Sequence, residues 1–264
     1  MENIDWAFVT ACIIGDGSLT EINRHNGTVM LSINHCIKQK PWLEFKADKL
    51  NAIFGRKCKV TEKTTFDDRT QKSYEGCTYS TTNQLLKPLY ALAYPNGKKH
   101  FSEELLKDLT AEHLAVLWAD DGNLEPHDRI GRLNLYDPEP QCKVVANWIE
   151  SICGAVGRYE DYEKNGIGRL RYPPSQMSKI VLAVRPYLHP SMFYKIDMQY
   201  KNNTRNSNAV SNPSIEYTVE TLPLVSDKPH CWWAALAKEA GLPRYKEGGK
   251  ENIRARLVGL LSNG

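Results

Sequence analysis

Two aspartates share the same sequence setting, near the end of an apolar run and directly before a glycine. Asp16 lies in the run VTACIIGDG, which starts at Val9, and Asp121 lies in the run LAVLWADDG, which starts at Leu114. Carboxylate oxygens are hard ligands that suit Mg²⁺, and two carboxylates held close together repel unless a cation lies between them. A cation in that position lowers the pKa of a bound water molecule. The pair of aspartates therefore indicates metal-dependent hydrolysis.

A single Asp-Gly pair after an apolar segment is most simply a turn. Two copies, separated by about the length of a small domain, favour an internal duplication instead. Each copy also carries small residues at four-residue spacing, which lets two helices approach closely. These residues are Ala7, Ala11 and Gly15 in the first copy and Ala111, Ala115 and Ala119 in the second. We therefore expect two helices side by side, capped by Asn3 or Asp5 and by Thr110, that bring their carboxylates to the same end.

The motifs resemble those of the LAGLIDADG homing endonucleases, in the single-chain form that carries both motifs in one polypeptide. Further similarity lies in the segment 185–195, which looks like the end of the second repeat in mitochondrial intron-encoded monomeric enzymes. Lys98-Lys99 looks like the matching end of the first repeat. The similarity extends from the N-terminus to about residue 200. It implies two pseudo-symmetric repeats at 1–103 and 104–200.

The resemblance implies a monomer that cuts both strands of a long double-stranded DNA target and leaves short 3′ overhangs. It assigns the catalytic acids to Asp16 and Asp121, which share two or three Mg²⁺ ions. Gly15 and Asp120 precede these acids and are expected to offer further oxygen ligands.

The resemblance also gives each repeat an active-site lysine, at Lys99 and Lys195, although alignment alone separates Lys99 from Lys98. A lysine near the scissile phosphate can stabilise developing negative charge or assist the water. Residues that orient water fall on Asn34 and Asn134.

The aspartate that matches Asp16 depends on the alignment. The ladders of small residues pair Asp16 with Asp120, whereas the Asp-Gly ends pair it with Asp121. One residue rotates a helical side chain by about 100°, so the two acids cannot have the same role. The resemblance favours Asp121, because the catalytic acid of the family directly precedes the residue that ends the helix.

The elements of each repeat follow from periodicity and from helix-ending signals. In the first repeat we predict strands at Thr28–Cys36, Arg56–Lys63 and Tyr74–Ser80, and helices at Pro41–Phe54 and Asn83–Tyr94. In the second we predict strands at Arg129–Tyr136, 157–162 and Ile167–Tyr172, a helix from Pro138 to Cys153 capped by Asp137, and a helix at Ser175–Tyr187. Each half reads as helix, two strands, helix, two strands, helix. This is an α+β fold with antiparallel sheets, each free on one face.

The free faces carry side chains that can read base edges in the major groove of DNA. The predicted DNA-facing residues are Thr28, Met30, Ser32, Asn34, Lys57, Lys59, Thr61, Lys63, Thr78 and Ser80 in the first repeat and Arg132, Asn134, Tyr136, Arg169 and Arg171 in the second. Polar outward residues are a general property of strands that face solvent, and the pattern alone leaves that alternative open.

Residues 201–264 lie outside the similarity. Asn and Ser are frequent in residues 201–213, as in a flexible linker, and two helical patterns follow at Cys231–Ala240 and Asn252–Leu261. Residues 237–242 are similar to the turn of a helix-turn-helix unit, and a plain helical hairpin is the alternative. We expect a small helical C-terminal extension.

Composition limits the class of protein. The content of 41% hydrophobic and 25% charged residues is that of a soluble globular protein, with no apolar run of membrane-spanning length and no signal-peptide pattern. The net charge of +3 requires the basic groups of a DNA-binding surface to be gathered on one face. The 7 cysteines form no CxxC pair, which indicates free buried thiols and no zinc. We expect a protein of the cytoplasm, bacterial or phage, or of an organellar matrix, and not a secreted one.

Two functions fit these patterns. The first is a site-specific, Mg²⁺-dependent DNA endonuclease. The second is a nucleic-acid-binding protein of the same fold that does not cleave, such as an intron maturase or a regulator. The two converging carboxylates favour the enzyme, because binding alone does not require them. The target site, the host gene and the intron, intein or free-standing setting are not encoded in these patterns.

Overall fold

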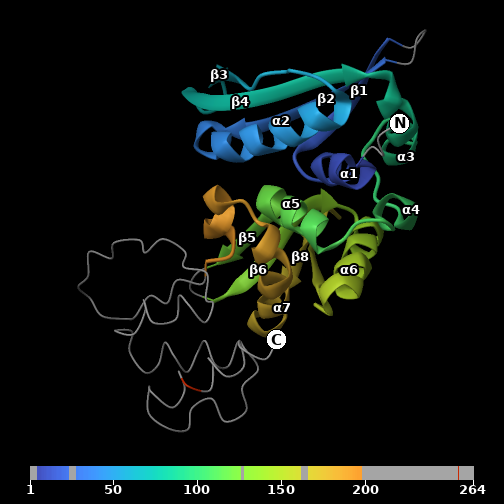
Figure 1. The fold of residues 1–264 in the computed structure, drawn as a ribbon. Helices are drawn as coiled ribbons and strands as arrows, with labels where there is room; N and C mark the ends of the chain where they lie inside the picture. Colours follow the sequence, from blue (N-terminus) through green and yellow to red (C-terminus); the bar gives the residue numbers. More distant parts are fainter. Residues whose placement is uncertain (1–4, 24–27, 126–127, 162–165, 198–254, 256–264) are drawn as a thin grey trace. The chain divides into compact units, whose positions relative to one another are not determined.

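The computed structural model describes residues 5–23, 28–125, 128–161, 166–197 and 255 (Figure 1). The first repeat consists of α1 (Trp6–Ile14), β1 (Gly17–Asn23), β2 (Thr28–Cys36), α2 (Lys40–Phe54), β3 (Thr61–Asp67), β4 (Lys72–Asn83) and α3 (Lys87–Ala93). Short 3₁₀ turns at Ile37–Gln39 and Gln84–Leu86 lead into α2 and α3.

The second repeat has the same order of elements. It consists of α5 (Ala111–Asp121), β5 (Gly122–Glu125), β6 (Ile130–Asp137), α6 (Glu139–Cys153), β7 (Arg158–Asp161), β8 (Gly168–Tyr172) and α7 (Pro174–Val184). Helix α4 (Glu103–Leu106) connects the repeats, and 3₁₀ turns at Arg185–Tyr187 and Pro190–Lys195 follow α7. The predicted α+β class and the doubled αββαββα order are confirmed.

Each repeat forms a four-stranded antiparallel sheet. The strand orders are β1-β2-β4-β3 and β5-β6-β8-β7. The alternation predicted for β2 is present, since Val29, Leu31 and Ile33 are fully buried and the residues between them face the other way. Helices α2 and α3 pack on the first sheet, and α6 and α7 pack on the second. The face opposite these helices therefore carries the outward side chains of each sheet.

Helices α1 and α5 contact each other between the two sheets (Figure 1). A helix that is apolar on all sides has to be buried, and nearly all of α1 and α5 is. Asp5 caps α1 by accepting the N–H of Phe8 at 3.0 Å. Thr110 is the N-cap of α5, and its N–H donates to Nδ1 of His113 at 2.9 Å. The predicted pair of motif helices at the repeat interface is thus present.

A glycine directly follows each motif aspartate because the next strand turns back over the helix end. A Cβ atom on Gly17 would collide with the carbonyl oxygen of Cys12, and a Cβ on Gly122 would collide with that of Trp118. Both oxygens belong to helical backbone and cannot move aside. The path of the strand therefore requires glycine at both positions.

Several boundaries differ from the sequence prediction. Strand β3 begins at Thr61, so Lys57 and Lys59 are exposed residues of the preceding loop and not strand residues. Asp137 ends β6 and does not cap α6, whose N-cap is Pro138. Strands β1 and β5, which directly follow the two motifs, were not located by the sequence patterns.

The cysteine prediction is partly wrong. All six described cysteines are free, and Cys12, Cys77 and Cys142 are buried, but Cys36 is exposed. The seventh, at position 231, lies outside the described residues, as does nearly all of the predicted helical extension. One compact unit spans residues 1–202 and a second spans 203–264. No helix among the described residues is both long and apolar enough to cross a membrane.

Substituting Gly17 tests the close approach of strand and helix. We expect Gly17→Ala to lower the free energy of unfolding by about 1–3 kcal/mol, because the added methyl group overpacks against fixed backbone. Urea unfolding measures the change. The control is Ser18→Ala at the adjacent exposed position, where we expect a change of at most about 0.5 kcal/mol. Equal stability of the two variants would contradict the steric requirement at Gly17.

Candidate active site

Asp16 and Asp121 lie at the adjoining ends of the two central helices. Asp121 is the last residue of α5, and Asp16 follows Gly15, the C-cap of α1. Burial and the negative charge of Asp120 together raise the pKa of Asp16 to about 6. Burial and the charges of Asp16 and Asp120 raise the pKa of Asp121 to about 8. Asp16 and Asp121 therefore act on each other electrostatically, as expected for the twin motifs, and Asp120 adds a third negative charge.

Lys99 and Lys195 reach the same place in the two repeats. The Nζ of Lys99 donates to the carbonyl oxygen of Gly15 at 2.8 Å. The Nζ of Lys195 donates to the carbonyl oxygens of Asp120 at 3.3 Å and Gly122 at 2.7 Å. Gly15 directly precedes Asp16 as Asp120 directly precedes Asp121, so each lysine lies at the carbonyl before its acid. This equivalence supports matching Asp16 with Asp121.

The two lysines are largely buried, and burial lowers the pKa of both. The neighbouring aspartates oppose that shift, because a nearby negative charge favours the ammonium form. Lys98, the alternative to Lys99, is exposed. The geometry therefore favours Lys99 as the lysine of the first repeat.

The two asparagines proposed to orient water differ in their contacts. Gly17 pairs with Ile33 across β1 and β2, and Gly122 pairs with Leu133 across β5 and β6, so Asn34 and Asn134 hold equivalent positions. The Nδ2 of Asn134 donates to the carbonyl oxygen of Asp121 at 3.3 Å.

Asn34 points instead to its own sheet. Its Oδ1 accepts from Lys63 Nζ at 2.9 Å and from Thr78 Oγ1 at 2.7 Å. Asn134 therefore lies at the C-terminal end of α5, whereas Asn34 lies on the outward face of the first sheet.

Asp120 is fully buried and saturated by donors. Its Oδ1 accepts from Trp42 Nε1 at 2.7 Å and from Lys46 Nζ at 2.9 Å. Its Oδ2 accepts from Lys46 Nζ at 3.0 Å and from the Asp16 N–H at 3.1 Å. Burial raises the pKa of Asp120, but the Lys46 ammonium and these hydrogen bonds outweigh it, and the pKa lies below its usual value. This carboxylate is therefore not free to bind a metal ion, and the backbone carbonyl oxygen of Asp120, the ligand expected from the sequence, accepts from Lys195 Nζ at 3.3 Å.

Sequence reasoning missed three residues of this cluster, namely Lys46, Trp42 and His35. Lys46 lies on the buried stripe of α2 beside Leu43 and Ala47, and a lysine in that place signals a buried acidic partner. His35 occupies an inward position of β2, where its Nδ1 lies 3.3 Å from Asp16 Oδ2. Burial and the Lys46 charge lower the pKa of His35 to about 4, so the ring is neutral at pH 7.

The donor set fits a divalent cation at the two raised carboxyl groups. One ligand atom each from Asp16, His35 and Asp120 lies within 4.8 Å of the others, but Lys46 already neutralises Asp120. Among the described residues, no ammonium group forms an ion pair with the carboxylate of Asp16 or Asp121, and the mutual repulsion of these carboxylates is what a divalent cation relieves. The carbonyl of Gly15, an expected ligand, accepts from Lys99 instead.

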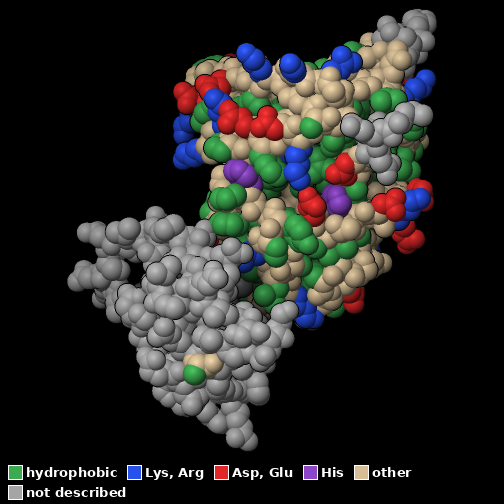
Figure 2. Space-filling view, in the orientation of Figure 1, with side chains coloured by type: hydrophobic (Ala, Val, Ile, Leu, Met, Phe, Trp, Pro, Cys, Tyr) green, Lys and Arg blue, Asp and Glu red, His purple; other side chains and the backbone are tan. Residues whose placement is uncertain are grey.

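The outward face of the first sheet carries the residues predicted from alternation. Cross-strand pairs align Ser18 with Ser32 and Ser80, and Thr61 with Thr78 and Asn34. The predicted Thr28, Met30 and Lys63 belong to the same face, together with Thr20 and Thr82, which the sequence patterns missed. In Figure 2 the first sheet lies at the top of the view, and basic side chains, in blue, follow its upper edge.

The outward face of the second sheet carries Arg132, Arg169 and Arg171. Arg132 forms ion pairs with Glu125 and Glu160, and Arg169 pairs with Glu160 at 2.6 Å. Within the described part of the chain, Arg171 makes no ion pair. Among the three predicted arginines, Arg171 is therefore the one whose charge is least compensated, and Arg158 lies opposite it across β7 and β8.

Tyr136, the last outward residue predicted in β6, has an unusual backbone. Its φ is 54°, where a bulky residue is strained, and the register between β6 and β8 shifts between Leu133 and Asp137. The bulge turns the exposed Tyr136 ring out of the regular alternation.

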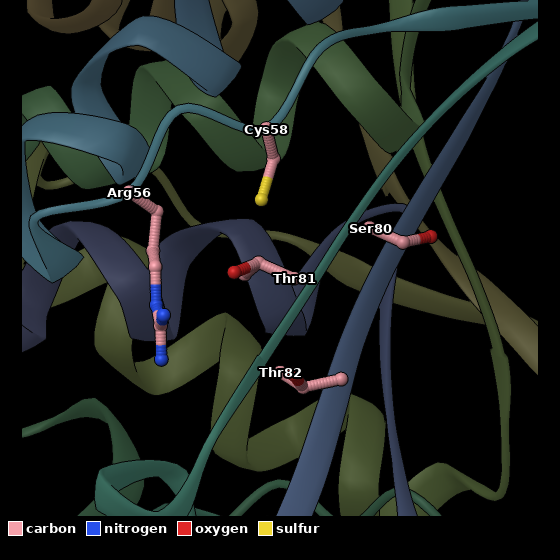
Figure 3. Close-up of a pocket in the computed structure, with 5 residues that line it drawn as sticks. All are labelled: Arg56, Cys58, Ser80, Thr81 and Thr82. Carbon is pink, nitrogen blue, oxygen red and sulfur yellow. The ribbon is translucent and has the colours of Figure 1, made fainter.

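A cavity of about 190 Å³ lies at the β4 edge, where β3 does not extend (Figure 3). Arg56, Cys58 and Thr81 point into it, while Ser80 and Thr82 belong to the outward face. The Thr81 hydroxyl is buried and accepts or donates no hydrogen bond within the described residues. The cavity does not include the motif aspartates.

Comparisons with known proteins are consistent with the duplicated motif. A family model described as the LAGLIDADG DNA endonuclease family matches residues 6–148. The protein RecA of Mycolicibacterium flavescens is 26% identical over 239 residues, and that of Mycolicibacterium chitae is 25% identical over 240 residues. These matches cover 84% of this chain and 53% of each relative, so the chain spans about half the length of the curated relatives it matches.

A solved structure has the same fold. The homing endonuclease I-WcaI bound to its DNA recognition sequence matches with a TM-score of 0.63 and 16% sequence identity. The match covers 73% of this chain and 85% of that chain.

The raised pKa of Asp121 predicts that the metal-free protein loses stability as pH rises. The carboxyl group ionises at 3.8 in the unfolded chain and at about 8 in the fold, so the folded state binds more protons between these values. Asp121→Asn removes this carboxyl group, and with it the free-energy cost of ionising it in the folded state. We expect a gain of at least about 1 kcal/mol at pH 8.5, or about 2–4 °C in Tm, and no gain at pH 3.5.

Calorimetry at the two pH values, with and without Mg²⁺, measures this effect. Mg²⁺ should raise the Tm of the wild-type protein more than that of Asp121→Asn. The control is Asp108→Asn, which removes an exposed carboxylate. If Asp121→Asn raised the Tm equally at both pH values, the raised pKa of Asp121 would be contradicted.

Proposed function

The chain belongs to the LAGLIDADG DNA endonuclease family, and from this we propose that it is a site-specific homing endonuclease. Its substrate is a long double-stranded DNA target, which it binds as a monomer and hydrolyses on both strands with a divalent cation, Mg²⁺ being the expected one. The products carry short 3′ overhangs. One observation carries the proposal: Asp16 and Asp121 end adjoining helices, each with a lysine bound at the carbonyl that precedes it.

The chemistry assigns separate roles to these residues. When bound, two or three divalent cations would supply an activated water and neutralise charge on the attacking and leaving oxygens. Asp16 and Asp121 would hold the cations. Lys99 and Lys195, close behind the acids, stabilise the negative charge that develops on the phosphate. Asn134 lies where it can orient the attacking water in the second repeat, through its contact with the Asp121 carbonyl.

The DNA lies on the outward faces of the two sheets in this proposal. Those faces are free of helices and carry hydroxyl, amide and basic side chains along their strands. Such side chains can hydrogen-bond to base edges in the major groove. The two faces belong to one chain, so a monomer is sufficient to contact both halves of a long target.

The alternative is a protein of this fold that binds nucleic acid without cutting, such as a maturase. Binding to a sheet face does not require two carboxyl groups with raised pKa values at the helix ends. It also does not require a buried lysine behind each of them. Ionisable groups whose pKa values are shifted by burial and by neighbouring charges are typical of catalytic sites. Their presence here favours cleavage.

Cleavage of the uninterrupted host locus tests the proposal. We expect the full chain to cut this duplex with Mg²⁺ and not with EDTA. Asp16→Asn and Asp121→Asn should each lower single-turnover cleavage by at least about 10³-fold, because metal coordination is lost, while specific binding in gel-shift assays persists. Asp108→Asn serves as the control with unchanged cleavage. Specific binding by the wild-type protein without cleavage in Mg²⁺ or Mn²⁺ would support the alternative.

Arg171 tests the assignment of the DNA face. We expect Arg171→Ala to weaken binding by about 1–3 kcal/mol if it contacts a base, and to reduce the salt slope by about 1 if it contacts a phosphate. Filter binding between 50 and 200 mM salt, a range of about fourfold in ionic strength, distinguishes these outcomes. Lys107→Ala removes the same charge at an exposed site near α4, where Glu104 pairs with it. Equal effects of the two substitutions would contradict a specific role for this face.

A further inference from the structure

The buried contact between Asp120 and the first repeat joins the two halves at the active site. Asp120 belongs to α5 of the second repeat, whereas all four hydrogen bonds to its carboxylate come from the first. Lys46 donates to both carboxylate oxygens, Trp42 donates to one, and the Asp16 N–H donates to the other. Through the bond from the Asp16 N–H, Asp120 of the second repeat holds the backbone of Asp16, the proposed catalytic acid of the first repeat.

This contact exists once in a fold that is otherwise duplicated. Gly15 holds the position in the first repeat that Asp120 holds in the second, since each precedes the motif acid. Helices α2 and α6 end at the left-handed glycines Gly55 and Gly154. Counted back from these glycines, Lys46 corresponds to Val145, which is buried and apolar. Asp121 therefore has no counterpart of this pair, because the first repeat offers no carboxylate at Gly15 and the second repeat offers no ammonium at Val145.

Gly15 leaves the space that Asp120 fills. A Cβ atom on Gly15 would collide with Oδ2 of Asp120. That oxygen is the one that accepts the Asp16 N–H. The glycine of one repeat and the aspartate of the other are thus complementary in shape across the interface.

We propose that Asp120, held by Lys46, is a positioning residue for Asp16 and has no counterpart for Asp121. The pair sets the backbone direction from which the Asp16 carboxylate projects toward the scissile phosphate. Its loss therefore impairs cleavage of one DNA strand more than the other. This inference rests on the proposed function, because it needs two active centres that cut separate strands. A displacement of about 1 Å in a catalytic group can cost about 10²-fold in rate.

Two double variants separate positioning from stability. Lys46→Met with Asp120→Leu removes both charges and leaves no acceptor for the Asp16 N–H. Lys46→Met with Asp120→Asn also removes both charges but keeps one acceptor oxygen. Replacement of a buried ion pair by apolar residues is often neutral for stability, so both proteins should fold. Gly15→Ala in the wild-type background displaces the Asp120 carboxylate with all charges retained.

Strand-resolved cleavage measures the effect. Each strand of the host-locus duplex carries its own 5′ fluorophore, and Lys99→Met and Lys195→Met identify which strand depends on which lysine. We expect the Leu double variant to slow the Lys99-dependent strand at least about tenfold relative to the other. The Asn double variant should show a smaller bias, and Gly15→Ala should slow the same strand. Equal slowing of both strands, or equal bias in the Leu and Asn variants, would overturn the proposal.

A second readout does not depend on cleavage. In ¹⁵N-labelled metal-free protein, the Asp16 amide proton is bonded to a carboxylate and should exchange slowly with solvent. We expect the Leu double variant to accelerate exchange at Asp16 at least about tenfold and to leave Asp121 unchanged. Unchanged exchange at Asp16 would overturn the proposal. A wild-type protein that binds but cuts neither strand would refute the proposed function alone, and the amide exchange would then decide the positioning role.

Discussion

Charge balance in a buried interface is the constraint on which this structure depends. Helices α1 and α5 pack closely in the core and bring Asp16, Asp120 and Asp121 to one end. Ammonium groups from three other elements surround the carboxylates: Lys46 on α2, Lys99 before α4 and Lys195 after α7. Unpaired charges in such an interior are costly, and removal of one partner is more costly than removal of both. The positions of the elements that cover the helix ends therefore depend on charge balance as well as on apolar packing.

Much of this arrangement could be predicted from the sequence, because its signals are local. The alternation of Val29, Leu31 and Ile33 predicts β2 and its outward face, and Gly55 predicts the end of α2. Strand β3 was placed too early, since Cys58 and Val60 alternate with exposed lysines in a loop that Asn51 ties down through Cys58. An exposed loop and an edge strand can share one exposure pattern, and only the pairing partner separates them.

The active-site contacts were harder to predict because they join residues far apart in the chain. The motifs identified Asp16 and Asp121, and resemblance placed the lysines, but periodicity cannot show that Lys46 meets Asp120. His35 occupies an inward strand position that also suits an apolar residue, so its place beside Asp16 carried no sequence signal. The alternation correctly predicted that Val29, Leu31 and Ile33 face inward, but it made no prediction for His35 or Lys46. What they meet depends on how the two repeats dock.

The complementarity of Gly15 and Asp120 also limits what the two halves can do apart. Two copies of the first repeat, assembled as a homodimer, would bring Gly15 against Gly15 and leave Lys46 buried twice without a carboxylate. Two copies of the second would bring Asp120 against Asp120, with the apolar Val145 where each needs an ammonium. Like charges or an unpaired ammonium at that depth oppose association. The single buried pair of Lys46 and Asp120 therefore makes the two halves complementary to each other and disfavours a homodimer of either half.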